Sequence, residues 1–261
     1  MLVNTDQEKA ELVLKGIKTG KYPESVYKYR TIKQASQILQ NFQFFFSSAV
    51  NFNDPFDCAL DEVVQYTPSD FSIWLSRLPS EITKEEKQKF KSLYENAVQE
   101  FNDKIKIIKN AKINKRGVLA LSKTNENILL WSHYAENHTG VAIKLNITKD
   151  IEFFLTPINI EYTQKYTPLN FLENPEESII HTLSKKSIDW EYEKELRIYK
   201  NSTGLQNINP VAITDVFFGV KSSQKDIQDI KNICNNNKLS HVNFYKAEKK
   251  HGEFAIYFNP I

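Results

Sequence analysis

The sequence predicts an α+β fold: a mixed, largely antiparallel split sheet with peripheral helices and a helical insertion. Two observations predict it. Short apolar or alternating runs of strand length recur along the 261 residues, roughly seven or more of them. Segments with helical periodicity separate some of these runs, but helices and strands do not alternate regularly. This order favours an α+β fold over a doubly wound parallel sheet.

The chain shows no internal repeat and no low-complexity linker, so we expect a single domain over residues 1–261. A polar helical segment at about residues 67–112 interrupts it, and its few apolar positions predict a hairpin appended to the surface. Thr83 followed by Glu86 has the form of a capping box, which marks a helix start inside this insertion.

Composition limits the function classes. The net charge of +2 excludes a global basic field for nucleic acid, although a local patch is still compatible with it. The two cysteines, Cys58 and Cys234, have neither metal-like nor redox-like spacing, which fits a reducing compartment. No stretch resembles a secretion signal or a membrane span, so we expect a cytoplasmic protein without a membrane partner.

The first strand candidate is SVYKYR, residues 25–30. Alternation places Tyr27 and Tyr29 on one face and Lys28 and Arg30 on the other. Helical periodicity flanks this strand, and an aromatic run follows. The expected elements are a helix at 6–18, a helix at about 31–40 and a strand at 42–50.

The sequence NDPFD predicts a tight turn, because Asn and Asp bond their own backbone and Pro fixes φ. Asp54 and Asp57 could bind a metal or orient a partner. We expect Asp54 or Asp57 to bond backbone amides instead, since only Asp61 and Glu62, beyond the turn, could add a carboxylate.

The clearest buried strand is residues 116–124, where four apolar residues follow one another. Asn125 can cap a helix that ends at Gly140, and residues 141–147 return as a strand. His133 belongs to a stripe beside the face that packs on the sheet. That face carries Trp131, Tyr134, Ala135 and His138, for which core packing is the ordinary explanation.

Residues 186–200, KSIDWEYEKELRIYK, organise the chain. In a strand over residues 193–199, Glu193, Glu195 and Arg197 share one face and apolar residues the other. Crowded carboxylates raise one another's pKa and a neighbouring Arg lowers it, and such opposing effects are common at active sites. The alternative interpretation of this face is a solvated Glu–Arg pair without a functional role. We expect this strand inside the sheet, paired on both sides.

Other expected elements are strands at 158–163, 214–220, 242–247 and 253–258, and helices at 175–185 and 222–236.

Five stretches together resemble one bacterial family: VYKYR, FFFSSAVNFNDPFDCAL, LALSKTNENILLWSHYAENHTGVAI, IDWEYEKELRIYK and DVFFGV. The chain is identified on these motifs as similar to the domain of unknown function 2971, over about residues 27–219. The segment at 67–112 carries no motif of that family. The family name implies no biochemistry, so function must be argued from the residues.

The first hypothesis is an NAD-using enzyme similar to ADP-ribosyltransferases or NAD glycohydrolases, as in bacterial effectors or defence toxins. Those enzymes carry an Arg or His on a first strand, a small polar element on a second and a Glu on a later one. Here Arg30, Ser122 with Thr124, and Glu193 with Glu195 follow that order, although the second element is not a full S-T-S.

In this hypothesis NAD is the substrate, and the partners are a small nucleotide and a protein or nucleic-acid acceptor. Glu195 would bind the ribose hydroxyl and stabilise the positive charge that develops when nicotinamide leaves, while Glu193 would orient the acceptor. Arg30 would pair with the pyrophosphate. Trp131 or Tyr134 would pack against the nicotinamide.

Two alternatives come from other classes. A magnesium-dependent nuclease would take carboxylates from Asp54 or Asp57 and from Glu193 or Glu195. Its lysine would be Lys194 or Lys200. A non-catalytic module for a protein or nucleotide would use the aromatic residues as contact anchors.

The preferred hypothesis expects no metal. It expects the motifs to meet in one cleft, because each contributes a polar or aromatic group that its own local structure does not need. The catalytic candidates are Glu195 and Glu193. The ligand-binding candidates are Tyr29, Arg30, Ser122, Trp131, His133, Tyr134 and Arg197.

Overall fold

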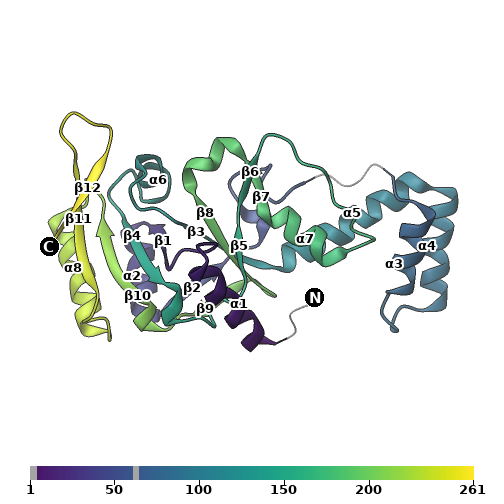
Figure 1. Ribbon diagram of the computed structural model, residues 1–261, viewed down its shortest axis with the longest axis horizontal. Coiled ribbons are helices and arrows are strands. Elements are labelled where there is room, and N and C mark those ends of the chain that lie inside the picture. Colours follow the sequence, from purple (N-terminus) through teal and green to yellow (C-terminus); the bar gives the residue numbers. More distant parts are fainter. Residues whose placement is uncertain (1–4, 61–64) are drawn as a thin grey trace.

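A single eight-stranded sheet forms the centre of the computed structural model, which describes residues 5–60 and 65–261 (Figure 1). Among the described residues of this sheet, only the β10–β11 pair is parallel, so the mixed, largely antiparallel α+β fold expected from the sequence is confirmed. The strand order is β12 (Ile256–Pro260), β11 (Asn243–Lys249), β10 (Ile213–Phe218), β4 (Val141–Asn146), β1 (Ser25–Arg30), β3 (Gly117–Ser122), β8 (Glu195–Lys200) and β5 (Pro157–Asn159).

Strands β1 and β3 are barely joined, which gives the sheet its split form. Their register contains one pair, Tyr27 with Ser122, whereas β1 pairs with β4 along its whole length. Beyond that pair, Ser47 takes the place of β1 and exchanges two backbone hydrogen bonds with Val118, at 3.0 and 2.8 Å. The edge of β3 therefore faces a gap between β1 and Ser47.

Two small ribbons complete the β structure. β2 (Gln43–Phe46) pairs with β9 (Gly204–Asn207), and β6 (Glu161–Thr163) pairs in parallel with β7 (Lys185–Ser187). The expected strand at 158–163 is thus two strands in two sheets, because β5 joins β8 while β6 joins β7. The expected strand at 42–50 ends at Phe46 and continues into the 3-10 helix η1 (Ala49–Asn51).

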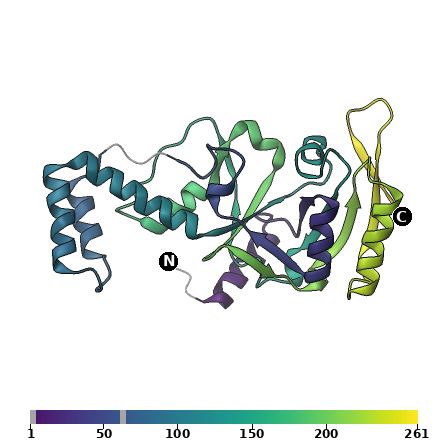
Figure 2. The same cartoon turned by 180° about the vertical axis from the view of Figure 1, so that it is seen from behind.

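One face of the sheet carries the largest apolar core. Alternating residues of β4 and β8, among them Ile143, Leu196 and Ile198, are fully buried there. Helices α2 (Ile32–Asn41) and α8 (Gln224–Asn236) contact each other across this face (Figure 2), and α1 (Asp6–Lys18) adds Val13. The 3-10 helices η2 (Ile147–Lys149) and η4 (Pro210–Ala212) complete the cover.

The opposite face has two separate apolar clusters. One surrounds the short helix α6 (Ile128–Tyr134), which is capped by Asn127 rather than by Asn125. α6 ends well before Gly140, because Glu136, Asn137 and His138 adopt positive φ of 50°, 54° and 71° and turn the chain. His138 therefore does not share a helical face with Trp131, which corrects the expectation.

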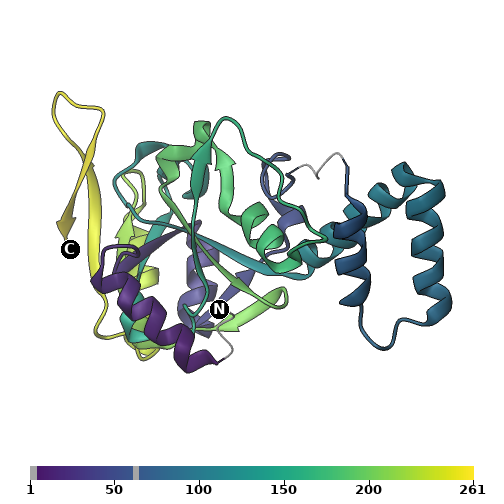
Figure 3. The same cartoon turned by 45° about the vertical axis from the view of Figure 1, so that its right-hand side comes forward.

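The second cluster joins α7 (Pro175–Ser184) to the three helices that project from one end of the molecule (Figure 3). These are α3 (Pro68–Ser76), α4 (Lys84–Asn96) and α5 (Val98–Lys115). Thr67 and Thr83 open α3 and α4 with capping boxes, as the sequence predicted for Thr83. Rings of Phe71 and Tyr94 stack at 4.6 Å, so these helices have an aromatic core of their own.

The stretch that organises the sequence, residues 186–200, is divided among three elements, the first of which is the end of β7. Residues Ile188–Glu193 form the 3-10 helix η3, and β8 begins only at Glu195. The expected strand at 193–199 is therefore wrong at its first two residues. The strand does lie inside the sheet, between β3 and β5, as expected.

Candidate functional site

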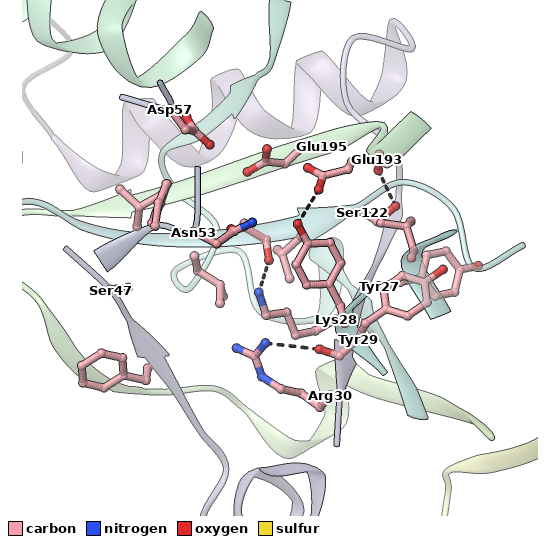
Figure 4. A pocket seen from close by; sticks show the side chains of 18 of the residues that line it. Tyr27, Lys28, Tyr29, Arg30, Ser47, Asn53, Asp57, Ser122, Glu193 and Glu195 are labelled. Atoms are coloured by element: carbon pink, nitrogen blue, oxygen red, sulfur yellow. Dashed lines mark hydrogen bonds between the residues drawn. The ribbon is translucent and has the colours of Figure 1, made fainter. Parts of the chain in front are cut away.

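A pocket of about 280 Å³ opens at the gap between β1 and β3 (Figure 4). Its walls are β1, β3 and the loop at 47–57, with η3 and the start of β8 closing one end. Six of the nine predicted site residues line it: Tyr29, Arg30, Ser122, Tyr134, Glu193 and Glu195.

Glu193 and Glu195 lie at one end of the pocket and share a cation. The ammonium of Lys186 donates to Oε2 of Glu193 at 2.5 Å and to Oε2 of Glu195 at 3.0 Å. Tyr134 donates its hydroxyl to Oε1 of Glu193 at 2.6 Å. All three charged side chains are 7% exposed or less, so these contacts are made away from bulk water.

Backbone conformation brings the two carboxylates together. Lys194, between them, adopts φ 46°, a left-handed conformation that costs about 1 kcal/mol for a residue with a Cβ. Neighbours in a regular strand point to opposite faces and alternate residues lie about 7 Å apart. The turn at Lys194 instead ends η3 and starts β8 with both carboxylates directed at Lys186.

Arg197 is placed behind the pocket and does not line it, which corrects its prediction as a ligand-binding residue. Its guanidinium is fully buried and donates to both oxygens of Asp57, at 2.8 and 2.6 Å. It also donates from Nε to Oε1 of Glu195 at 2.7 Å and from Nη1 to the carbonyl oxygen of Leu183 at 3.0 Å. Arg197 therefore ties the loop at 47–57 to β8.

The electrostatics of this acidic end keep Glu195 and Lys186 charged. Burial would raise the pKa of Glu195, but the charges of Arg197 and Lys186 outweigh it and hold that pKa at about 2. Burial lowers the pKa of Lys186, yet the three carboxylates around it raise that pKa above its usual value. Burial and the bond to Glu193 raise the pKa of the Tyr134 hydroxyl, which therefore stays a donor.

Trp131 and His133 do not line the pocket, so two further expectations are corrected. Trp131 is fully buried, donates from Nε1 to the carbonyl oxygen of Asn125 at 2.7 Å and packs edge-on against Tyr29. The ordinary core explanation therefore holds for it. His133 is exposed, with its ring 6.2 Å from that of Tyr134.

Two other predicted residues fix the backbone of the pocket wall. Ser122 donates its hydroxyl to the carbonyl oxygen of Glu193 at 2.7 Å and accepts from the amide of Thr124 at 3.1 Å. Tyr29 donates its hydroxyl to the carbonyl oxygen of Thr124 at 2.9 Å. These bonds hold the end of β3 against η3.

The other end of the pocket is basic. Lys28 donates from Nζ to the carbonyl oxygen of Ala120, across the gap between β1 and β3 (Figure 4). Arg30 donates from Nη1 to the carbonyl oxygen of Tyr29 at 3.2 Å. Within residues 5–60 and 65–261 neither side chain forms an ion pair, whereas the carboxylates at the acidic end do.

Sequence reasoning missed Lys28 and Lys186 as members of the site. Lys28 could have been found, because alternation in β1 places it on the same face as Arg30. Lys186 lies in the organising stretch, but no local pattern shows that its side chain reaches Glu193 and Glu195.

The NDPFD turn behaves as expected at Asp54, which accepts from the amide of Phe56 at 2.9 Å. Asp57 instead pairs with Arg197 and lies 3.6 Å from the ammonium of Lys186. Asp61 and Glu62 lie outside the described residues. In the part of the chain that the structure describes, no three His, Cys, Asp or Glu side chains are grouped as a metal site would require.

Fold and pocket together define an α+β protein with a polar pocket in a split, largely antiparallel sheet. The model of the family described as "Protein of unknown function (DUF2971)" matches residues 130–198, which confirms the resemblance stated from the motifs. Searches of curated proteins and of solved structures gave no match. The matched segment contains Tyr134, Lys186, Glu193, Glu195 and Arg197.

Proposed function

We propose that the protein cleaves the nicotinamide–ribose bond of NAD and transfers the ADP-ribosyl group to water or to a macromolecular acceptor. One observation carries the proposal: Glu193 and Glu195 at one end and Arg30 at the other line the same pocket. A dinucleotide has matching parts, namely a ribose that becomes positively charged and an anionic pyrophosphate.

The chemistry requires a carboxylate that is ionised and fixed before the bond breaks. The glycosidic electrons leave with nicotinamide, which departs as a neutral molecule, and the ribose carries the positive charge until water or the acceptor adds and loses its proton. Charges that are already oriented stabilise such a transition state without reorganising. Glu195, whose pKa is held at about 2, meets this requirement at neutral pH.

The contacts favour a division of roles that differs from the sequence-based one. Glu195 accepts from Arg197 with both of its oxygens and is a fixed negative charge. Glu193 accepts from Lys186 and from the Tyr134 hydroxyl, at the pocket surface. We assign the contact with the ribose hydroxyl to Glu193, and packing against the nicotinamide to Tyr134, since Trp131 is inside the core.

The two lysines proposed for the nuclease alternative lie outside the pocket. Lys194 is exposed and Lys200 donates to the carbonyl oxygen of Glu152, and neither lines the pocket. The lysine among the carboxylates is Lys186, which ion-pairs with the groups that a metal would need.

We also propose that the enzyme acts in the cytoplasm. Both cysteines are free thiols and both are buried, which fits a reducing compartment. Among the described residues, no helix has the length and apolarity that crossing a bilayer demands.

Glu193→Gln is the direct test. It keeps the shape of the side chain, removes its charge and should lower the rate of nicotinamide release from NAD by about 10²-fold, as for the loss of one transition-state contact. Release is measured by chromatography, with a chelator present and absent. Glu191→Gln is the matched control, because Glu191 lies on the same 3-10 helix but is exposed.

Folded Glu193→Gln protein with unchanged release would overturn the assignment of Glu193. Chelator-sensitive strand cleavage of nucleic acid, without nicotinamide release, would replace the proposed function by the nuclease.

A further inference from the structure

The basic end of the pocket holds two basic side chains that have no charged partner among the described residues. Lys28 and Arg30 occupy alternate positions of β1 and so project from the same face, with Cα atoms about 7 Å apart. Each is only partly exposed, and each bonds one neutral carbonyl oxygen. A cation removed from water without an opposite charge costs free energy, which a bound anion would recover.

The position of Lys28 explains how such a cation is kept in place. β1 and β3 share one register pair, and beyond it the carbonyl oxygen of Ala120 has the side chain of Lys28 as a donor in the gap. The amine thus bridges the two strands where their backbones have separated. Because the bond to Ala120 is made by a flexible side chain, a ligand in the pocket can displace it without breaking the sheet.

The surroundings of this end donate hydrogen bonds and carry no free negative charge. Ser47, Asn51 and Asn53 form the facing wall. Asp57 also lines the pocket, but both of its oxygens accept from Arg197. Hydroxyl and amide donors beside two cations form the arrangement that binds phosphate oxygens in proteins.

We propose that Lys28 and Arg30 form a subsite for the phosphate groups of a nucleotide, and that Lys28 leaves the carbonyl oxygen of Ala120 when the phosphates bind. This deepens the proposed function by naming the part of the ligand that the basic end holds. It rests on that function only for the identity of the nucleotide, since phosphate binding requires no bond cleavage.

The charges around Lys28 give the sign of the proton linkage. Burial and the positive charge of Arg30 lower its pKa well below the usual value, while Glu195 and Glu193 oppose this and Lys186 adds to it. The titratable neighbours Tyr27, Tyr29 and Tyr134 line the same pocket. Burial also lowers the pKa of Arg30, to about 10, which leaves it charged at neutral pH. A bound phosphate favours the charged amine, so binding raises the pKa of Lys28 and consumes a proton.

The test is calorimetric binding of inorganic pyrophosphate, ADP-ribose and adenosine to the whole chain, in two buffers of different ionisation enthalpy, between about pH 7 and pH 10. We expect pyrophosphate and ADP-ribose to bind, ADP-ribose with net proton uptake, and adenosine to bind at least about tenfold more weakly than ADP-ribose. Lys28→Met and Arg30→Met should each weaken pyrophosphate binding by about tenfold or more. Lys28→Arg should bind without proton uptake, because its charge is permanent.

Lys123→Met is the matched control, since Lys123 is also partly exposed and has a pKa lowered by burial, but it does not line the pocket. If Lys28→Met does not fold, acetylation of Lys28 in the wild-type chain, measured by mass spectrometry, should be suppressed by pyrophosphate while that of Lys123 is not.

Absence of pyrophosphate binding, equal binding by the Lys28→Met or Arg30→Met protein, or adenosine binding as tight as that of ADP-ribose would overturn the subsite. Pyrophosphate binding without nicotinamide release from NAD would leave the subsite in place and refute the proposed function instead.

Discussion

The two ends of the pocket differ in whether their buried ionisable side chains form ion pairs. At the acidic end Glu193, Glu195 and Asp57 are all ion-paired with Lys186 or Arg197. At the basic end Lys28 and Arg30 bond neutral carbonyl oxygens only. The difference separates charges that hold the structure together from charges available to a ligand.

Physical chemistry explains why both kinds can exist in one pocket. Each buried ion loses hydration worth several kcal/mol, and the acidic end recovers part of it through short contacts, of which those of Arg197 with Asp57 and Glu195 use two hydrogen bonds each. At the basic end burial also costs hydration, since it lowers the pKa of Lys28 and of Arg30, and no ion pair within the described residues offsets that cost until a ligand arrives. The predictions below test this contrast, starting from the largest expected effect.

Replacing each arginine by methionine compares the two ends with the same change. Arg197→Met leaves two buried carboxylates short of their main partner and should lower the free energy of unfolding by about 3–5 kcal/mol. Arg30→Met removes an unpaired cation and should change it by less than about 1 kcal/mol. Urea denaturation measures both. Equal losses in the two variants would show that the basic end is also held by paired charge.

Acid should lower the free energy of unfolding by removing the charge of Glu195 at the acidic end. The folded pKa of Glu195, about 2, lies below the ordinary 4.5, so its ion pairs add stability above the ordinary value. That contribution, roughly 3 kcal/mol at about 1.4 kcal/mol per pKa unit, is lost as the pH falls from about 5 towards 2.

Glu195→Gln provides the comparison for the acid experiment. It should be less stable than the wild type near neutral pH, and the two stability curves should converge on acidification, because the variant has no charge to lose there. Curves that stay parallel down to about pH 3 would contradict the role given to Glu195.

Asp54→Ala should cost less stability than the loss of either Arg197 or the charge of Glu195. Asp54 fixes the loop that carries Asp57 to the acidic end, but its bond is to the amide of Phe56. Losing one backbone bond in a turn should cost about 1 kcal/mol and leave the acid dependence unchanged. Thermal unfolding with and without magnesium checks this, and a metal-dependent shift that vanishes in the variant would identify a metal ligand instead.

Some of the site could be predicted from the sequence because its cause is local. Strand alternation placed Leu196 and Ile198 in the core, with Glu195 and Arg197 on the other face, and the structure agrees. Alternation in β1 likewise placed Lys28 beside Arg30. The family motifs identified the segment that contains the carboxylates, which the match over residues 130–198 confirms.

The errors occurred where distant residues override a local pattern. Continuing β8 back to Glu193 was the simplest interpretation of the alternation, but Lys194 is left-handed. Its neighbours Glu193 and Glu195 both pair with Lys186, and the hydroxyl of Ser122 donates to the carbonyl oxygen of Glu193. Arg197 was assigned to a ligand because its partner Asp57 is 140 positions away and gave no signal.

The sequence by itself determined which residues alternate and which carboxylates are neighbours, because those properties depend on spacing along the chain. The tertiary structure alone decided that β1 and β3 separate after one register pair, and that Lys186 and Arg197 neutralise the acidic end. It also left Lys28 and Arg30 without an ion partner in the part of the chain that the structure describes. Whether a buried charge is paired depends on three-dimensional neighbours, which spacing does not specify.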